Sequence, residues 1–372
     1  MKNPIDLMLD YQLAARHYPG AVVHVEQDGR VLAHAVAGRL RGEGEAPMRE
    51  DALFRIASLS KAVVSVMTLM LVDEGLVGLD APVQDYLPQL AKQRMPDGAP
   101  PERPVTVRDL LRHTAGVPYA GELRDPALRA KAQALGLDGR MASMTPAEFL
   151  DALVTLPLAN QPGAAFRYGF ATDLAGLVVE RVTGQRLGEA LRARLLDPLG
   201  MVDTGFVVAD ADLARLAGAH ASDKAWHGFD RMFRDGQAKG SPMHSGGGGL
   251  ISTVADYAAF ARMLAGGGEA AGHRFLKPET FAQMASDQLG PNVDGPAGYA
   301  GPGFGFGLAL AVRHDWGAAA VPSPAGELTW SGVTGTGLYV RPADRWFAIK
   351  FSCNNASRLM ARFEFRRAAG ML

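Results

Sequence analysis

A serine and a lysine three residues apart, Ser58 and Lys61, are the pair in this chain that most clearly predicts chemistry. They stand at the start of residues 62–72, a stretch so densely apolar that it predicts a buried helix. Positions i and i+3 share a helix face, so Lys61 is expected beside the Ser58 hydroxyl. Burial should lower the pKa of the lysine, which can then accept the serine proton. The pair predicts a nucleophile whose oxyanion is favoured by the positive end of the helix.

The same four residues also fit an ordinary helix N-cap. In that interpretation Ser58 or Ser60 accepts a backbone hydrogen bond at the helix start, and Lys61 extends into solvent. Taken alone, the tetrapeptide favours the cap, because so short a motif recurs by chance. The rest of the chain favours the nucleophile.

Strands are expected at both ends of the chain, with helices between them. A turn at Asp28-Gly29 predicts a hairpin of strands 21–25 and 31–36. Further strands are expected at 305–312, 327–330, 336–340 and 346–353. Helices are expected at 5–17, from Ser58 to about Gly75, after the capping box Thr145-Pro146-Ala147-Glu148, at 171–182 closed by Gly184, at 187–196, at 252–264 capped by Thr253 or Ser252, and at 357–369.

This order predicts an α/β (α+β) protein with an antiparallel sheet built from both termini and flanked by helices. Residues 1–80 and 241–372 are expected to form the sheet-containing domain. Residues 81–240 are expected to form an inserted, mainly helical domain, with the active site between the two.

The composition is that of a soluble enzyme. The 372 residues are 48% hydrophobic and 21% charged, with a formal net charge of −1, which gives no electrostatic reason to expect nucleic acid or an anionic membrane as partner. The single cysteine, Cys353, excludes an intramolecular disulfide and is expected to pack in a core strand. Residues 1–6 lack the apolar segment of a signal peptide, and no apolar run is long enough to span a bilayer. We therefore expect a cytoplasmic protein without a membrane partner.

Seven sequence blocks, in their order along the chain, resemble the serine β-lactamase and penicillin-binding-protein superfamily. The resemblance is closest to its family VIII carboxylesterase branch, which is related to class C β-lactamases, and it implies a β-lactamase/transpeptidase-like fold. The blocks are Asp51 to Lys61 with the Ser-x-x-Lys motif, Val72 to Val83, Leu110 to Gly116, Tyr168 in its Pro162 to Tyr168 context, Pro198 to Phe206, Gly246 to Thr253, and Trp330 to Val333.

The resemblance assigns roles residue by residue. Ser58 is the expected nucleophile, and Lys61 is its base or the group that tunes that base. Tyr168 matches the second catalytic motif and is expected to relay the proton, although a core aromatic with a satisfied hydroxyl is the alternative. The oxyanion hole is expected to be the backbone N–H groups of Ser58 and Val333.

Two positions depart from the β-lactamase pattern. Phe170 replaces the asparagine of Tyr-x-Asn, and Trp330-Ser331-Gly332 replaces Lys-Thr-Gly. The first change removes an amide that would bind an acylamino side chain, and the second removes the charge that would hold a penicillin carboxylate. Trp330 offers an apolar wall with one N–H donor, or simply covers the core, and Gly332 lets substrate approach the strand. We expect these four positions, 170 and 330–332, to contact small neutral esters.

The other residues that could carry chemistry are interpreted as structural. His113 is expected to be a structural loop residue with local hydrogen bonds, and the glycine run 246–249 a close backbone turn, not a phosphate loop. No metal motif and no Gly-x-Ser-x-Gly occurs, so no metal, no cofactor and no α/β-hydrolase elbow is expected. The loops 119–140 and 221–245 are expected to shape the acyl pocket, with its lining residues guessed as Trp226, Phe229 and Met232.

The sequence thus predicts a serine carboxylesterase that hydrolyses short-chain esters through a Ser58 acyl-enzyme, with a small-molecule ester as its partner. Weak β-lactamase activity is compatible with the branch. Three alternatives stay open: an acyltransferase or amide hydrolase on the same fold, a β-lactamase or D-peptidase, and a non-catalytic binding protein. The oligomeric state is not indicated.

Overall fold

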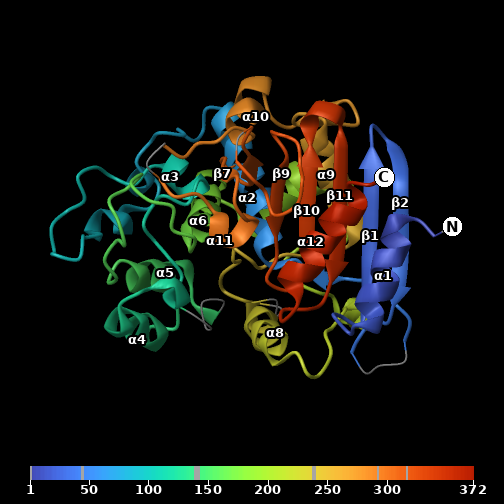
Figure 1. Ribbon diagram of the computed structural model, residues 1–372. Helices are drawn as coiled ribbons and strands as arrows, with labels where there is room; N and C mark the ends of the chain where they lie inside the picture. The colour runs from blue at the N-terminus through green and yellow to red at the C-terminus, as the bar shows by residue number, and fades with distance from the viewer. Residues whose placement is uncertain (1, 43–45, 138–142, 237–239, 291–292, 316) are drawn as a thin grey trace.

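A seven-stranded antiparallel sheet, drawn in Figure 1, organises the computed structural model, which describes residues 2–42, 46–137, 143–236, 240–290, 293–315 and 317–372. The strand order is β2-β1-β11-β10-β9-β8-β7. The N-terminal hairpin pairs with the last strand, so Val22 lies opposite Phe351 and Val36 lies opposite Val22. The predicted antiparallel sheet built from both termini is confirmed. Its strands are β1 (Gly20–Gln27), β2 (Arg30–Gly38), β7 (Phe304–Phe306), β8 (Ala311–Arg313), β9 (Leu328–Ser331), β10 (Gly337–Arg341) and β11 (Trp346–Ser352).

Helices cover both faces of the sheet, because alternate residues of its central strands are apolar on each side. On one face, α1 (Pro4–Ala14) and α12 (Arg358–Ala369) pack over Val23, Val25 and Ala348. On the other face, α9 (Val254–Ala265) packs over the residues in between, Ile349 and Phe351 among them. Figure 1 shows α1 and α12 in front of the strands, with both termini on that side of the molecule.

The remaining helices lie mostly in the middle of the chain, next to the free edge of the sheet at β7 (Figure 1). The helix α2 (Ser60–Asp73) is buried almost throughout and packs against α6 (Ala171–Thr183). The division into two domains stays a prediction. The other helices are α3 (Val107–Leu111), α4 (Pro126–Ala134), α5 (Pro146–Leu153), α7 (Leu187–Leu191), α8 (Lys224–Gly236), α10 (Pro278–Met284) and α11 (Ala297–Ala300). Short two-stranded ribbons are β3 (Phe54–Arg55) with β4 (Ile251–Ser252), and β5 (Glu269–Ala270) with β6 (His273–Arg274).

One predicted strand is wrong. The stretch 305–312 is two strands, β7 and β8, because residues 307–310 reverse the chain and Gly307 N donates to the Leu310 carbonyl at 2.8 Å. A Cβ at Gly307 would lie 2.0 Å from the Met284 carbonyl oxygen, so only glycine fits at the reversal. The turn residues are themselves apolar and buried, which made the turn look like continuous strand.

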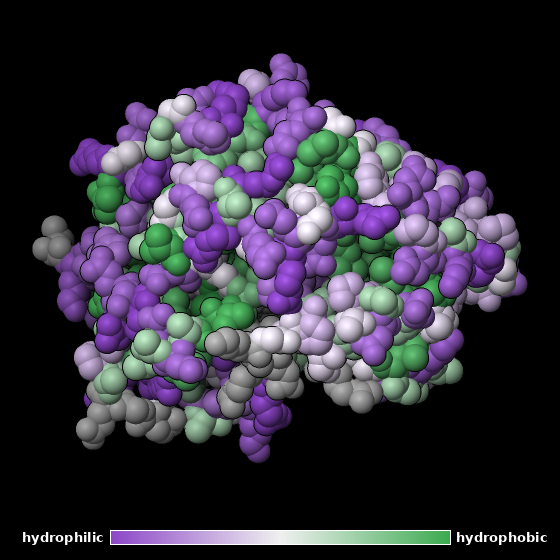
Figure 2. All heavy atoms as spheres, turned by 180° about the vertical axis from the view of Figure 1, so that it is seen from behind, coloured by the Kyte–Doolittle hydropathy of each residue, from purple (hydrophilic) through white to green (hydrophobic). Residues whose placement is uncertain are grey.

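The rear face of the molecule is mostly hydrophilic, with apolar residues in small separate groups (Figure 2). Within the described ranges, each helix is too short or too polar to cross a bilayer.

Candidate active site

Ser58 lies on a strained turn that lines a cavity. It belongs to a single 3₁₀ turn, residues 57–59, that precedes α2, so the predicted placement on the first α-helical turn is off by one element. Ala57 before it has a φ of 47°, the left-handed region that costs a non-glycine residue about 1–2 kcal/mol. The pairing of β3 with β4 holds the segment that leads into this turn. Ser58 is half-buried and lines a cavity of about 570 Å³, which we call the Ser58 cavity.

The helix-cap alternative is wrong. No side chain caps the start of α2. The Ser60 hydroxyl accepts a hydrogen bond from Leu250 N at 3.0 Å and is fully buried. Lys61 is only 1% exposed, so it does not extend into solvent.

The Lys61 ammonium is held by two oxygen atoms. Its Nζ donates to the Tyr119 hydroxyl at 2.9 Å and to the Gly247 carbonyl at 2.5 Å. The same Nζ lies 4.6 Å from the centre of the Tyr168 ring, a cation–π distance. The spacing argument placed Lys61 near Ser58, but it could not supply these partners, which come from three distant segments.

The predicted fall in the pKa of Lys61 is wrong. Burial does act to lower this pKa, but the oxygens of Tyr119 and Tyr168 and the carboxyl group of Asp173 outweigh burial and raise it. Lys61 therefore carries its proton in the resting protein. Burial raises the pKa of the Tyr119 phenol, and the Lys61 charge opposes that rise.

Asp173, on α6, fixes the carbonyl group that Lys61 contacts. One carboxyl oxygen accepts hydrogen bonds from Ser245 Oγ at 2.6 Å and from Gly247 N at 2.9 Å. The other, Oδ2, is buried and has no hydrogen-bond partner among the described residues. Burial raises the pKa of Asp173, whereas Lys61 acts to lower it. Gly247, in the glycine run 246–249, thus connects the Asp173 carboxyl group to Lys61 through its backbone N–H and carbonyl.

A short backbone bridge brings the two tyrosines together. Pro118 pairs with Gly169, and Phe170 N donates to the Val117 carbonyl at 2.9 Å. A Cβ at Gly169 would lie 2.2 Å from that same carbonyl oxygen, so the close approach needs glycine. As a result the rings of Tyr119 and Tyr168 stand edge to face, with centroids 5.8 Å apart.

Tyr168 lies among aromatic rings, and its hydroxyl has a donor. Trp330 Nε1 donates to the Tyr168 hydroxyl at 3.2 Å, and the Tyr299 ring lies 4.7 Å from the Tyr168 ring. His113 packs against Tyr168 at 4.8 Å, and burial holds the pKa of His113 well below its usual value. His113 makes the expected local hydrogen bond through its backbone, whose N–H donates to the Leu110 carbonyl at 3.2 Å, whereas its buried Nδ1 has no hydrogen-bond partner among the described residues. The predicted N–H donor of Trp330 is used to fix Tyr168.

The prediction that Phe170 contacts substrate is corrected by its burial. Phe170 is 1% exposed and is absent from the residues that line the Ser58 cavity. Its ring packs edge to face against Tyr119 at 4.8 Å and against Phe149 at 5.7 Å. Phe170 therefore supports Tyr119 from behind.

The turn after β9 is clamped to the segment before Ser58. Thr334 Oγ1 donates to the Arg55 carbonyl at 2.7 Å, and Thr336 Oγ1 donates to the Ile56 carbonyl at 3.0 Å. Asn355 Nδ2 donates to the Val333 carbonyl at 2.9 Å. Ser58, Val333 and the preceding residues 330–332 all line the Ser58 cavity. The structure thus brings the two predicted oxyanion-hole residues to one cavity.

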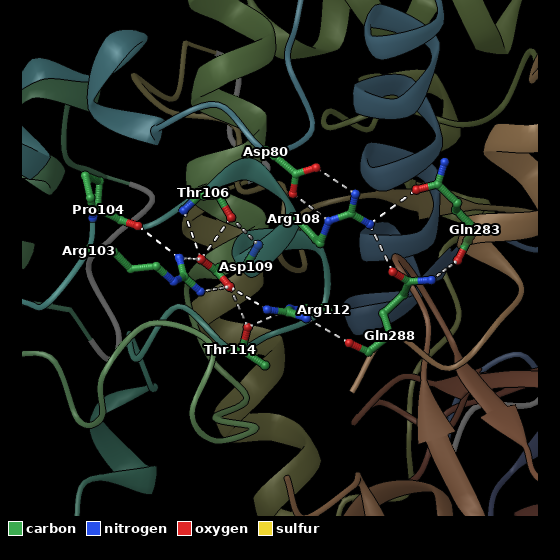
Figure 3. Close-up of polar contacts among 10 residues, drawn as sticks. All are labelled: Asp80, Arg103, Pro104, Thr106, Arg108, Asp109, Arg112, Thr114, Gln283 and Gln288. Carbon is green, nitrogen blue, oxygen red and sulfur yellow. Dashed lines mark hydrogen bonds and ion pairs between the residues drawn. The ribbon is translucent and has the colours of Figure 1, made fainter. Parts of the chain in front are cut away.

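A buried polar network anchors the loop that carries His113 and Tyr119 (Figure 3). Asp109, with no exposed side-chain surface, accepts hydrogen bonds from Arg112 Nη2 at 2.9 Å and Thr114 Oγ1 at 3.0 Å. Burial opposes its charge, but the hydrogen bonds from arginines and backbone outweigh burial and lower the pKa of Asp109 to about 2. Arg112 also reaches across to the Gln288 carbonyl at 2.8 Å. The network fixes where the loop begins.

The guessed cavity-lining residues are confirmed in part. Phe229 and Met232, on α8, line the Ser58 cavity, whereas Trp226 is buried elsewhere. Of the two loops predicted to shape the pocket, residues 138–140 and 237–239 lie outside the described residues. No group of three or more His, Cys, Asp or Glu side chains in the described chain is placed to hold a metal ion.

Four functional candidates were missed from the sequence. Tyr119 follows the block that ends at Gly116 by three residues, a spacing that could have flagged it. Asp173, Arg358 and Arg362 lie on helices whose patterns show no chemistry, and only the tertiary structure brings them to the site.

Comparisons with known proteins agree over nearly the whole chain. A family model described as Beta-lactamase matches residues 5–369. Esterase EstB of Burkholderia gladioli is 35% identical over 356 residues, 90% of this chain and 86% of that protein. Lovastatin esterase of Penicillium rubens is 32% identical over 292 residues, 74% of this chain and 70% of that protein. The solved structure of EstCE1, described as a hydrolase with promiscuous acyltransferase activity, has a TM-score of 0.83 at 26% identity and covers 98% of this chain and 97% of its own. The similarity extends over the sheet and the central helices alike.

Proposed function

Because this chain belongs to the beta-lactamase family, we propose that it is a serine carboxylesterase of the family VIII branch, acting on short-chain esters through an acyl-enzyme on Ser58. Its fold class, β-lactamase/transpeptidase-like, is the one expected from the sequence. The esterase names of EstB and lovastatin esterase support the reaction class. The observation that carries the proposal is the half-buried Ser58 in a cavity that Tyr119, Tyr168 and the turn at Val333 also line.

In the first half-reaction, the Ser58 hydroxyl attacks the ester carbonyl carbon and gives its proton to the Tyr168 oxygen. In this scheme Tyr168 acts as the proton acceptor, with Lys61 Nζ 4.6 Å from the centre of its ring and the Trp330 N–H donating to its oxygen. The backbone N–H groups of Ser58 and Val333 stabilise the oxyanion.

The tetrahedral intermediate then collapses. The carbon–oxygen bond to the leaving alcohol breaks, and Tyr168 returns the proton to that alcohol. In the second half-reaction, water gives a proton to Tyr168 and the water oxygen attacks the acyl carbon. The bond between that carbon and Ser58 Oγ then breaks, Tyr168 returns the proton to Ser58 Oγ, and the acid is released. Tyr119 donates no proton in this scheme; it accepts the Lys61 hydrogen bond and holds the ammonium in place.

The test is a burst experiment with p-nitrophenyl acetate and p-nitrophenyl butyrate. We expect release of about one equivalent of p-nitrophenol before steady turnover, with both lost in Ser58→Ala. The kcat/KM of that variant should fall by about 10³-fold or more, roughly 4 kcal/mol. Ser60→Ala is the matched control, since Ser60 is a buried serine two residues away, at the start of α2, whose hydroxyl accepts from Leu250 N. Full activity in Ser58→Ala contradicts the mechanism, and turnover of a cephalosporin far above that of esters would favour a β-lactamase.

Acyl transfer is the second candidate. EstCE1 is described as having promiscuous acyltransferase activity, and an acyl-enzyme can be intercepted by an alcohol as well as by water. Adding a short alcohol to the butyrate assay should then divert product from butyric acid to the butyrate ester. Unchanged acid yield at saturating alcohol would leave hydrolysis as the reaction.

A further inference from the structure

Two histidines face each other on the hairpin at the edge of the sheet. His24 on β1 lies opposite His34 on β2, and β2 is the outermost strand (Figure 1). Their Nδ1 atoms are 3.3 Å apart. The His24 ring is half-buried and stacks on the Phe347 ring, with centroids 5.7 Å apart, whereas His34 is exposed. Neither histidine lines the Ser58 cavity, so the pair is separate from the site proposed for catalysis.

The other nitrogen of each ring faces a carboxyl group. His24 Nε2 lies 3.1 Å from Glu26 Oε2. His34 Nε2 lies 3.3 Å from Glu50 Oε1. Burial opposes the charge of Glu26, but hydrogen bonds from Arg262 and His24 outweigh burial and lower the pKa of this carboxyl group. A carboxylate only accepts hydrogen bonds, so each ring places its hydrogen on Nε2 and keeps a lone pair on Nδ1.

The two Nδ1 lone pairs therefore face each other, which is unfavourable unless a cation joins them. A proton would have to make one ring an imidazolium, and for His24 burial outweighs the contacts with Glu26 and lowers the pKa. A metal ion satisfies both lone pairs without protonating either ring. Two imidazole nitrogens, each about 2.0–2.1 Å from a tetrahedral zinc ion, are about 3.3–3.4 Å apart, which matches the observed 3.3 Å. A carboxylate behind each imidazole is also the arrangement that orients histidine ligands in zinc sites.

We propose that His24 and His34 bind one zinc ion through their Nδ1 atoms, with water completing the tetrahedron, and this replaces the expectation of no metal. Glu26 and Glu50 orient the two rings. The distance favours zinc over square-planar copper, because adjacent ligands at right angles, about 2.0 Å from the ion, would be only about 2.8 Å apart. Two side-chain ligands are fewer than the three or four of catalytic and structural zinc sites, so we expect a Kd on the order of 10 µM. The ion would tie the edge strand β2 to β1.

The test is a calorimetric titration of the full chain with zinc sulfate at about pH 7.5, where histidine is largely neutral, after treatment with a chelator and its removal. One equivalent should bind. His34→Gln and His24→Gln should each weaken binding by about tenfold or more, because each removes one of the two ligands. Glu50→Gln should weaken binding several-fold, since it leaves His34 in place and removes only the group that orients its ring. His273→Gln is the matched control, since His273 is an exposed histidine on another short ribbon and should not affect binding.

A second measurement asks whether the bound ion holds the hairpin. Zinc at about 100 times its Kd should raise the urea midpoint of the wild type and of His273→Gln, and should leave that of His34→Gln unchanged. The site is overturned if the wild type binds no zinc at that concentration, in which case the two rings share a proton instead. It is also overturned if His34→Gln binds zinc as the wild type does, or if His273→Gln weakens binding as much as His34→Gln. Because His34 is exposed, His34→Gln carries the test alone if His24→Gln fails to fold.

Discussion

Replacing Lys350 by methionine is expected to stabilise the protein. Lys350 is buried on β11, between β1 and β10 in the sheet. Its Nζ donates weak hydrogen bonds to Gln12 Oε1 at 3.3 Å and the Ala361 carbonyl at 3.4 Å, and it lies 4.4 Å from the centre of the Tyr18 ring. Burial lowers the pKa of Lys350 from 10.5 to about 7, and the nearby Glu364 only partly opposes that change. The fold thus holds an ammonium that it disfavours.

The sign and size of the effect follow from the two pKa values. Between about pH 7 and pH 10.5 the unfolded chain binds the lysine proton and the folded protein does not. Through this group, stability rises with pH across that window, and below about pH 7 the full penalty is present. A pKa difference of about 3.5 corresponds to at most ~5 kcal/mol. Methionine removes the charge and leaves both acceptors satisfied, because Tyr18 still donates to Gln12 Oε1 and Gln12 Nε2 still donates to the Ala361 carbonyl at 3.2 Å.

Urea unfolding of wild type and Lys350→Met from about pH 7 to about pH 10 measures this difference. The gain of the variant should be largest near pH 7 and should shrink by about 1.4 kcal/mol for each pH unit above it. Lys92→Met is the control, since Lys92 is exposed and its replacement should change stability by less than about 0.5 kcal/mol. A gain that does not vary with pH, or a loss of stability near pH 7, would mean that the folded protein holds Lys350 charged without cost, and the reasoning from burial would fail.

Three further predictions concern the site. Tyr119→Phe removes a Lys61 acceptor and should lower kcat for p-nitrophenyl butyrate by about tenfold or more with little change in KM; an unchanged kcat would return Tyr119 to a packing role. Asp173→Asn keeps an acceptor for Gly247 N but removes the negative charge that raises the pKa of Lys61. The alkaline limb of the kcat/KM profile should therefore move to lower pH, and an unchanged limb would mean that Asp173 does not influence the pKa of Lys61. Gly332→Ala would place a Cβ 2.3 Å from Thr336 Oγ1 and should lower kcat/KM by about 10²-fold through a displaced backbone, with circular dichroism to confirm folding; a loss below threefold would show that the turn can yield.

Local chemistry made much of the fold predictable. Asp28 and Gly29 have φ of 46° and 78°, the backbone that the Asp-Gly hairpin signal predicts. The Thr145 and Glu148 capping box and the left-handed Gly184 at the end of α6 are both confirmed. The cap of α9 is Thr253, one of the two expected residues. Strands of two residues, such as β3 and β4, escaped prediction because they are too short to show any periodicity.

The sequence motifs, taken in their order along the chain, predicted several residues of the site. The contacts and charges of those residues were not predictable, because they depend on the tertiary structure. Ser58, Trp330 and Val333 were named from the sequence, and all three line one cavity. The protonation of Lys61 was not predictable, because its pKa depends on Tyr119 and Asp173, which no spacing rule relates to it.

The pairing of β1 with β11 has a consequence for biosynthesis. These two strands come from opposite ends of the chain, so β1 leaves the ribosome long before its partner exists. Contacts between such distant segments slow folding, because a very large loop must close before they form. The clamp from Thr334 and Thr336 onto the carbonyls before Ser58 has the same requirement. A nascent chain that lacks β11 therefore leaves one edge of β1 unpaired, and a chain that ends before β9 has no Val333 beside Ser58, so the nucleophile matures only after these late strands have been made.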